Sequence, residues 1–258
     1  MMHIILVQPT RWHEDGLRNF AQIRAELGRS ELGSTATSLI VLPELVGSEL
    51  ERHAYEESAS DLALLFDAWV IAGSHHVRRG GSVFNSGVAV DPRGAIVANY
   101  EKANPYGVEV DSGVDPGSGS ASFEIDGRRV LVMLCADFWF ADSFDGAGQM
   151  DMIVVPAFSI TQRRSPDSAR ALWAHMAVAR AYEHMAFVAV SDWAASSSYR
   201  EHRGSGAAGL ADPNPAGPHG SYYSAVGPQS VADFPITFDL LDDLRVNRSA
   251  RGFVRGAD

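Results

Sequence analysis

The sequence predicts an α/β fold in which a mixed β-sheet is layered against helices. Its apolar runs are short, rich in valine and isoleucine and apolar throughout, which is typical of strands buried on both faces. Segments with helical spacing lie between several of them, and this alternation indicates a layered α/β domain. Two tight turns join neighbouring runs, so we expect antiparallel hairpins beside the parallel strands.

The elements follow from the spacing of the apolar residues. Continuous apolar runs predict strands over His3–Val7, Leu39–Leu42, Trp69–Ala72, Val83–Val90, Ile96–Ala98, Val130–Leu134, Met152–Val155 and Ala186–Val190. Helical spacing predicts helices over Glu14–Leu27, Glu51–Phe66 and Asp167–Met185. The third helix is predicted to bury a face that carries Leu172, Met176, Ala179 and Tyr182.

Two hairpins and one long loop complete the expected architecture. Asp91-Pro92-Arg93-Gly94 is a turn sequence between two of the apolar runs. Asp126-Gly127 joins Ala121–Ile125 to Arg129–Leu134. Ser196–Gly220 is rich in serine, glycine and proline, which predicts a long loop and makes it our candidate for a lid.

Composition narrows the class of protein. Of 258 residues, 46% are hydrophobic and 21% charged, which is typical of a globular domain with a sizeable core. The formal charge of −11 argues against nucleic-acid binding, which depends on Lys and Arg against phosphates. A single cysteine excludes an intrachain disulfide and fits a reducing, cytoplasmic setting. Without a leader-like start, a membrane-length apolar run or a shift in composition, we expect one soluble domain over residues 1–258.

Three predicted strands end beside a side chain with catalytic chemistry. These side chains are Glu44 after Leu39–Leu42, Lys102 after Ile96–Tyr100 and Cys135 after Val130–Leu134. Strand ends in α/β folds converge on a crevice, so the carboxylate, ammonium and thiol can meet there. A carboxylate of raised pKa can take the thiol proton when the sulfur attacks a carbonyl. The ammonium and the backbone N–H of Ala136 can then stabilise the anion that forms.

Spacing alone favours a structural interpretation of all three residues. A single cysteine at the end of an apolar strand is most often inert packing. Glu44 can cap a helix that begins near Leu45, and Lys102 can be a solvated loop residue. The residues that flank them change this weighting.

The flanking segments form a recognisable set. They are Ile40-Val41-Leu42-Pro43-Glu44, the stretch from Phe84-Asn85-Ser86 to Tyr100-Glu101-Lys102, and Val130–Asp137. In register, these segments resemble those that carry the glutamate, lysine and cysteine of the nitrilase superfamily, a family of carbon–nitrogen hydrolases. The order of the three residues matches as well, at intervals of 58 and 33 residues. The resemblance extends over essentially the whole chain.

The resemblance implies a four-layer α-β-β-α sandwich with mixed sheets, which usually pairs into a homodimer or a larger homo-oligomer. It implies Cys135 as nucleophile, Glu44 as base and Lys102 as oxyanion stabiliser. A second glutamate often precedes the nucleophile strand; Glu109 matches it best, and Asp111 is the alternative.

Three residues at the nucleophile bear on substrate binding. Ala136 is expected to contribute to the oxyanion site, and Phe138 and Trp139 to an apolar wall of the substrate pocket. The nitrilase branch commonly has Trp directly after the cysteine, where this chain has Ala136. This difference favours an amidase or N-carbamoyl amide hydrolase that acts through a cysteine thioester.

Other functions remain as alternatives. A nitrilase or an amide-forming acyltransferase would use the same site on a small amide, carbamoyl or nitrile substrate. From another class, a catalytically silent binding or scaffold protein of the same fold would need none of the three reactive side chains, so their presence argues against it.

Two further patterns lack the context that their chemistry requires. Gly204–Gly209 matches G-x-G-x-x-G, but no strand precedes it and prolines follow. His75 and His76 point to opposite faces of a strand, and His175 and His184 lie on opposite sides of a helix. We therefore predict neither a dinucleotide site nor a metal site, and expect no cofactor.

Overall fold

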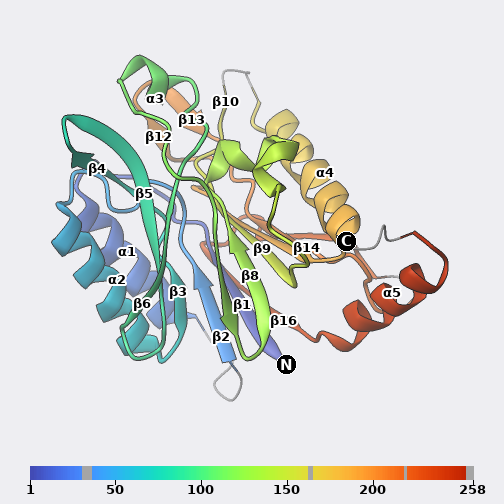
Figure 1. Cartoon of the computed structure of the whole chain (residues 1–258). Helices are drawn as coiled ribbons and strands as arrows, with labels where there is room; N and C mark the ends of the chain where they lie inside the picture. Colours follow the sequence, from blue (N-terminus) through green and yellow to red (C-terminus); the bar gives the residue numbers. More distant parts are fainter. Residues whose placement is uncertain (31–36, 162–164, 218–219, 254–258) are drawn as a thin grey trace.

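Two β-sheets lie face to face in the computed structural model, and helices cover their outer faces (Figure 1). The structure describes residues 1–30, 37–161, 165–217 and 220–253. The helices are α1 (Gly16–Arg29), α2 (Arg52–Phe66), α3 (Val108–Asp111), α4 (Asp167–His184) and α5 (Asp239–Ala250). Two 3₁₀ helices follow the apolar run Val130–Leu134, namely η1 (Cys135–Trp139) and η2 (Ala141–Phe144).

The first sheet has the strand order β16-β1-β2-β3-β5-β4, and β6 also pairs with β5. Its strands are β1 (Met2–Val7), β2 (Thr37–Val41), β3 (Trp69–Ile71), β4 (His75–Arg79), β5 (Ser82–Val90), β6 (Ile96–Glu101) and β16 (Val231–Ile236). The strands β1, β2 and β3 run parallel, and the other pairs are antiparallel. The hairpin predicted around Asp91-Pro92-Arg93-Gly94 is confirmed as β5 and β6.

The second sheet has the order β15-β14-β11-β9-β8-β7. Its strands are β7 (Ala121–Ile125), β8 (Arg128–Val132), β9 (Met152–Pro156), β11 (Phe187–Ser191), β14 (Gly209–Ala211) and β15 (Tyr223–Ala225). The strands β8, β9 and β11 run parallel, and the predicted hairpin at Asp126-Gly127 is confirmed as β7 and β8. A third, small sheet consists of β10 (Ile160–Thr161), β12 (Ser198–Tyr199) and β13 (His202–Gly204).

The continuous apolar strands are explained by burial on both faces. In β1, Ile4 packs between the two sheets, whereas Ile5 packs against α1 and α2. In β9, Val154 packs between the sheets, whereas Ile153 packs against α4. Successive side chains of a strand point to opposite faces, so each strand joins two cores. The result is the four-layer α-β-β-α order that the resemblance implies.

Two local predictions were wrong. The buried face of α4 carries Trp173, Ala177 and Ala181, while Leu172 is 55% exposed. Small alanines let the helix approach the sheet closely, and this packing rotates the predicted face by one residue. The segment Ser196–Gly220, predicted as loop, contains β12, β13 and β14, while its residues 218–219 lie outside the described part.

None of the helices in the described part of the chain is both long and apolar enough to cross a bilayer. The cytoplasmic setting and the homodimer stay predictions.

Candidate active site

The three reactive side chains meet where their strands end. Glu44 follows β2, Lys102 directly follows β6, and Cys135 opens η1 after β8. Lys102 Nζ lies 2.8 Å from Glu44 Oε1. Burial raises the pKa of the Glu44 carboxyl, and the Cys135 thiol lies close enough to this carboxyl to oppose the rise. The predicted convergence of Glu44, Lys102 and Cys135 is therefore present in the structure.

Four buried side chains form what we call the ionic cluster: Glu44, Asn85, Lys102 and Glu109. Lys102 Nζ donates to Glu44 and also to Glu109 Oε2, at 2.5 Å. Glu109 is buried, whereas Asp111 is exposed. Of the two acidic residues considered from the sequence, Glu109 is the one that contacts Lys102.

The backbone holds Glu44 in place. Its N–H donates to Ala157 O at 3.2 Å, and its carbonyl accepts from Trp193 Nε1 at 2.7 Å. The second carboxylate oxygen, Oε2, accepts from the Phe158 N–H at 3.1 Å. These contacts come from residues that follow β9 and β11, in the second sheet. Because Glu44 itself follows β2, in the first sheet, both sheets hold it in place.

Cys135 adopts a backbone conformation that is rare for a residue with a side chain. Its φ of 41° lies in the left-handed region, where a Cβ is sterically disfavoured, and such outliers cluster at functional sites. It begins a 3₁₀ helix, where the first N–H groups have no acceptor within the helix. The N–H of Ala136 is therefore available beside the thiol.

The electrostatics favour a neutral thiol beside a carboxylate base. Burial and the Glu44 carboxylate raise the pKa of Cys135 well above its ordinary value, although Lys102 opposes this. Burial also raises the pKa of Glu44, with Lys102 opposing and Glu109 adding to the rise. Burial alone would lower the pKa of Lys102, but Glu44, Cys135 and Glu109 together raise it well above its usual range. Lys102 is therefore a permanent cation.

The Asp137 carboxylate joins the segment after Lys102 to the segment after Cys135. Asp137, two residues after Cys135, accepts from Ala103 N at 3.1 Å and from Asn104 N at 2.8 Å. The side-chain amide of Asn104 donates to it as well. Because Ala103 follows Lys102 directly, these bonds set the position of Lys102 relative to Cys135.

An apolar cavity of about 360 Å³ opens on Cys135. It is lined by Tyr106, Cys135, Ala136, Trp139, Phe140, Phe158, Ser159, Ile160, Ala169, Leu172 and Trp173. We call it the thiol cavity. Its walls come from η1, the end of β9, β10 and α4. Ala136 and Trp139, which were predicted to lie at the substrate pocket, both line this cavity.

Phe138 does not line the thiol cavity, contrary to the expectation for this residue. It is fully buried and stacks on Trp173, with ring centroids 5.9 Å apart. A 3₁₀ helix has three residues per turn, so Ala136 and Trp139 project to one side while Phe138 points into the core. Trp139 in turn packs edge-on against Trp173, at 5.0 Å.

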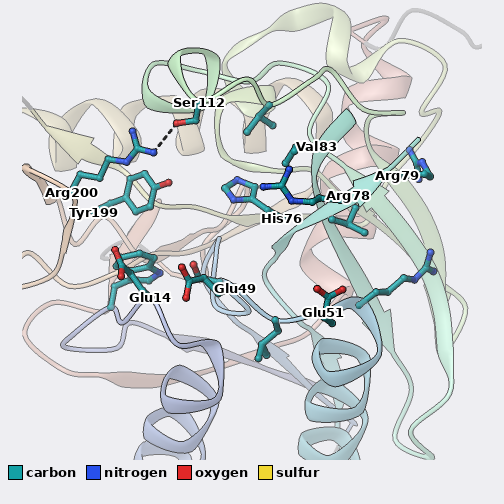
Figure 2. A pocket seen from close by; sticks show the side chains of 16 residues that line it. Glu14, Glu49, Glu51, His76, Arg78, Arg79, Val83, Ser112, Tyr199 and Arg200 are labelled. Carbon is teal, nitrogen blue, oxygen red and sulfur yellow. Dashed lines mark hydrogen bonds between the residues drawn. The ribbon is translucent and has the colours of Figure 1, made fainter. Parts of the chain in front are cut away.

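A second cavity, of about 650 Å³, is lined by His76 and by several charged side chains (Figure 2). We call it the charged cavity. Figure 2 shows the carboxylates of Glu14 and Glu49 on one side of it and His76, Arg78 and Arg200 on the other. Burial lowers the pKa of His76, while the charges of Glu109 and Lys102 reach it with opposite effects. His76 thus faces this cavity while lying close to the cluster.

Two buried polar residues of the site were not among the residues predicted from the sequence. Asn85 lies within the resembling segment, and its amide donates to both Glu44 and Glu109. Asp192, just after β11, accepts from Ser159 N at 2.9 Å and Ala207 N at 2.6 Å. Burial raises the pKa of Asp192 to about 7. Its bond to Ser159 steadies one wall of the thiol cavity.

Among the described residues, no group of three His, Cys, Asp or Glu side chains is arranged to hold a metal ion. His75 stacks on Tyr55 with ring centroids 4.1 Å apart, whereas His76 faces the charged cavity, so the two point apart as predicted.

The chain matches a family model over most of its length. Residues 6–213 match the family model of the carbon-nitrogen hydrolases, and the chain belongs to this family. A curated relative, the 2-oxoglutaramate amidase of Bacillus subtilis, is 23% identical over 189 residues, which cover 67% of this chain and 70% of the relative. The predicted membership of the nitrilase superfamily is confirmed.

Solved structures share the fold at low sequence identity. XC1258 from Xanthomonas campestris, a CN-hydrolase superfamily protein with an arsenic adduct in the active site, superposes with a TM-score of 0.77 at 20% identity, covering 99% of this chain and 98% of that one. Nit3 of Saccharomyces cerevisiae, from the nitrilase superfamily, gives 0.75 at 16% identity, over 98% and 95%. An amidase variant from Nesterenkonia sp. AN1, with acrylamide added to its active-site cysteine, gives 0.70 at 18% identity, over 98% and 100%.

Proposed function

We propose that this chain hydrolyses the carbon–nitrogen bond of small amides or N-carbamoyl compounds through a thioester on Cys135. The observation that carries the proposal is the placement of the Cys135 thiol against the Glu44 carboxylate, which Lys102 Nζ contacts at 2.8 Å. A nucleophile, a base and a fixed cation within hydrogen-bonding reach are the parts that acyl transfer requires.

The first half of the proposed reaction forms the thioester. Glu44 takes the proton of the Cys135 thiol as the sulfur adds to the amide carbon, so no stable thiolate has to exist beforehand. This fits the raised pKa of the thiol, which disfavours a free thiolate at rest. The ammonium of Lys102 and the N–H of Ala136 stabilise the negative oxygen of the tetrahedral intermediate. Glu44 then returns the proton to the departing nitrogen, and the carbon–nitrogen bond breaks. When the substrate is a primary amide, the group that leaves is ammonia.

The second half releases the acid. Glu44 takes a proton from water, the resulting hydroxide adds to the thioester carbon, and the same two donors stabilise the oxyanion. When the carbon–sulfur bond breaks, the proton returns to the sulfur and the thiol is restored. Glu109 touches neither substrate nor thiol in this scheme. It holds Lys102 from the side opposite Glu44 and keeps it protonated.

The thiol cavity supplies the substrate preference. The side chains around Cys135 include Trp139, Phe158 and Trp173, which favour a small acyl group with apolar surface. Ala136 in place of the tryptophan common in the nitrilase branch favours an amide over a nitrile. The amidases among the relatives are in keeping with this choice. We propose that the whole chain acts as a single carbon–nitrogen hydrolase domain.

Ammonia release tests the proposal. Primary amides of increasing acyl size, N-carbamoyl amino acids and nitriles would be incubated with the wild-type chain and with Cys135→Ala and Glu44→Gln. We expect ammonia from one of the first two classes and none above background from either variant. Asp111→Asn is the matched control for Glu44→Gln, because it also neutralises a carboxylate, but an exposed one outside the ionic cluster.

Two results would contradict the proposal. Undiminished ammonia release by Cys135→Ala would exclude the thioester. A wild-type chain that is folded yet inert across the panel, with a thiol that iodoacetamide does not label, would favour the silent scaffold.

A further inference from the structure

Asn85 lies inside the ionic cluster but has no part in the reaction proposed above. It comes from β5, and its side chain is fully buried. A single atom, Nδ2, lies 2.9 Å from Glu44 Oε1 and 2.7 Å from Glu109 Oε1. An amide nitrogen carries two protons, so each carboxylate receives one of them.

Lys102 closes the same arrangement from the other side. Its Nζ donates to Glu44 Oε1 and to Glu109 Oε2, so each carboxylate lies between one charged donor and one neutral donor. Two carboxylates that share one ammonium repel each other. A neutral amide between them supplies a donor to each without adding a charge, which neither a lysine nor an aspartate would do.

The orientation of the Asn85 amide follows from this network. If the amide were flipped, Oδ1 would face two carboxylate oxygens, which is repulsive. The flipped amide would therefore be the less favourable of the two orientations. In the observed orientation, Oδ1 is buried and no donor among the described residues reaches it. This orientation directs both protons at the carboxylates.

The acceptor sites of Glu44 show what the amide does for the base. Lys102 and Asn85 occupy both acceptor sites of Oε1, while the Phe158 N–H occupies one site of Oε2. One site on Oε2 is left for the Cys135 thiol. Without the Asn85 amide, Oε1 would regain a free site, and the carboxylate could accept the thiol proton in more than one orientation.

Asn85 also fixes the main chain beside the lysine. The backbone carbonyl oxygen of Asn85 accepts from the backbone N–H of Lys102 at 2.8 Å. The side chain and the backbone of one residue therefore set Lys102, Glu44 and Glu109 relative to one another.

We propose that Asn85 is a positioning residue for the hydrolase reaction: its amide holds Glu44 and Glu109 on either side of Lys102 and leaves Glu44 Oε2 as the acceptor for the Cys135 proton. This inference rests on the proposed function. It assigns to Asn85 no contact with substrate.

Substitutions of Asn85 separate positioning from mere packing. Asn85→Asp keeps the shape but replaces the donor by a third carboxylate, and Asn85→Ala removes the amide altogether. We expect kcat to fall about 100-fold in Asn85→Asp and about 10-fold in Asn85→Ala, with KM within about threefold of wild type, because the base is affected and the substrate pocket is not. The acidic limb of the kcat profile should move to higher pH in Asn85→Asp, since a third carboxylate disfavours ionised Glu44.

Asn99→Ala is the matched control, because Asn99 lies on the adjacent strand β6 and is exposed. It should leave kcat, KM and the pH profile unchanged. If Asn85→Asp does not fold, as judged by near-ultraviolet circular dichroism, Asn85→Ala and Asn85→Ser carry the same comparison of kcat with KM.

Labelling of Cys135 by iodoacetamide separates this inference from the proposed function. Suppose that wild type releases no ammonia, but that the labelling rate falls from wild type to Asn85→Ala and again to Asn85→Asp. In that case the positioning role stands and the hydrolase proposal fails. If wild type is an active hydrolase and the folded Asn85 variants keep its kcat and its acidic limb, with only a lower melting temperature, Asn85 is structural and this inference is overturned.

Discussion

The thiol cavity and the charged cavity adjoin the same ionic cluster but differ in chemistry. The thiol cavity has aromatic and aliphatic walls and reaches Cys135, whereas the charged cavity carries glutamates and arginines and reaches His76 (Figure 2). Of the described residues, none lines both. Trp12, Phe158 and Tyr199 pack together between them, with ring centroids 5.0 to 6.0 Å apart.

The difference indicates which side of the cluster handles substrate. An oxyanion is stabilised most by fixed donors in a water-poor, low-dielectric setting, and the apolar walls supply it on the Cys135 side. On the other side, exposed charges are solvated and contribute little to binding. We therefore propose that the substrate binds in the thiol cavity, and the following predictions test that proposal.

The largest expected effect is at the thiol itself. Cys135→Ala should lower kcat/KM by at least about 10⁴-fold, because it removes the proposed nucleophile beside the Glu44 carboxylate. Steady-state ammonia release checks it, and circular dichroism establishes that the variant is folded. A loss of less than tenfold would place the reaction outside this cavity.

The pH dependence should report Glu44. The proposed base must be ionised, and burial raises its pKa, so activity should fall as the pH drops through a value above that of an ordinary glutamate. Below that value, kcat/KM should fall about tenfold per pH unit. A profile of kcat/KM against pH measures it, with the folded fraction recorded at each pH. An acidic limb at the pKa of an exposed glutamate would be incompatible with a buried base.

The aromatic wall should affect substrate binding to a smaller degree. Trp139→Ala removes a large side chain from the thiol cavity, and we expect a fall in kcat/KM of about 10- to 30-fold, mainly through KM. Phe140→Ala is a useful comparison, because Phe140 lines the same cavity but is 44% exposed and should matter less. An unchanged KM for Trp139→Ala would mean that the acyl group lies elsewhere.

The smallest effect is expected in the charged cavity. Arg78→Ala should leave kcat/KM within about twofold of wild type, because an exposed arginine side chain contributes little when it is not in contact with the reacting groups. The same assay checks this at low and at moderate salt. A large, salt-sensitive rise in KM would mean that the substrate contacts the charged cavity, and it would contradict the proposed difference between the two cavities.

The features that could be predicted from the sequence are those that depend on residues close together in the chain. Apolar runs give the strands, turn residues give the hairpins, and strand ends bring Glu44, Lys102 and Cys135 together. The resemblance to the nitrilase superfamily supplied the four-layer order, which local patterns alone do not determine. The resemblance also pointed to Glu109, and the contact of Glu109 with Lys102 distinguishes it from Asp111.

The remainder depends on contacts between distant segments. The amide of Asn85 becomes informative only once Glu44 and Glu109, from two other segments, lie beside it. Phe138 and Trp139 are neighbours of similar size, and the 3₁₀ geometry of η1 decides which one lines the cavity. The buried face of α4 follows from packing on the second sheet, which helical spacing alone does not define.

The most direct test of the central claim is the intact mass of the chain during turnover. Wild type would be mixed with the best amide substrate and quenched in acid within milliseconds to seconds. We predict a transient species heavier by the acyl group minus one hydrogen, located at Cys135 by peptide mapping and absent from Cys135→Ala. Continued turnover without this adduct, or an adduct on another residue, would contradict the account.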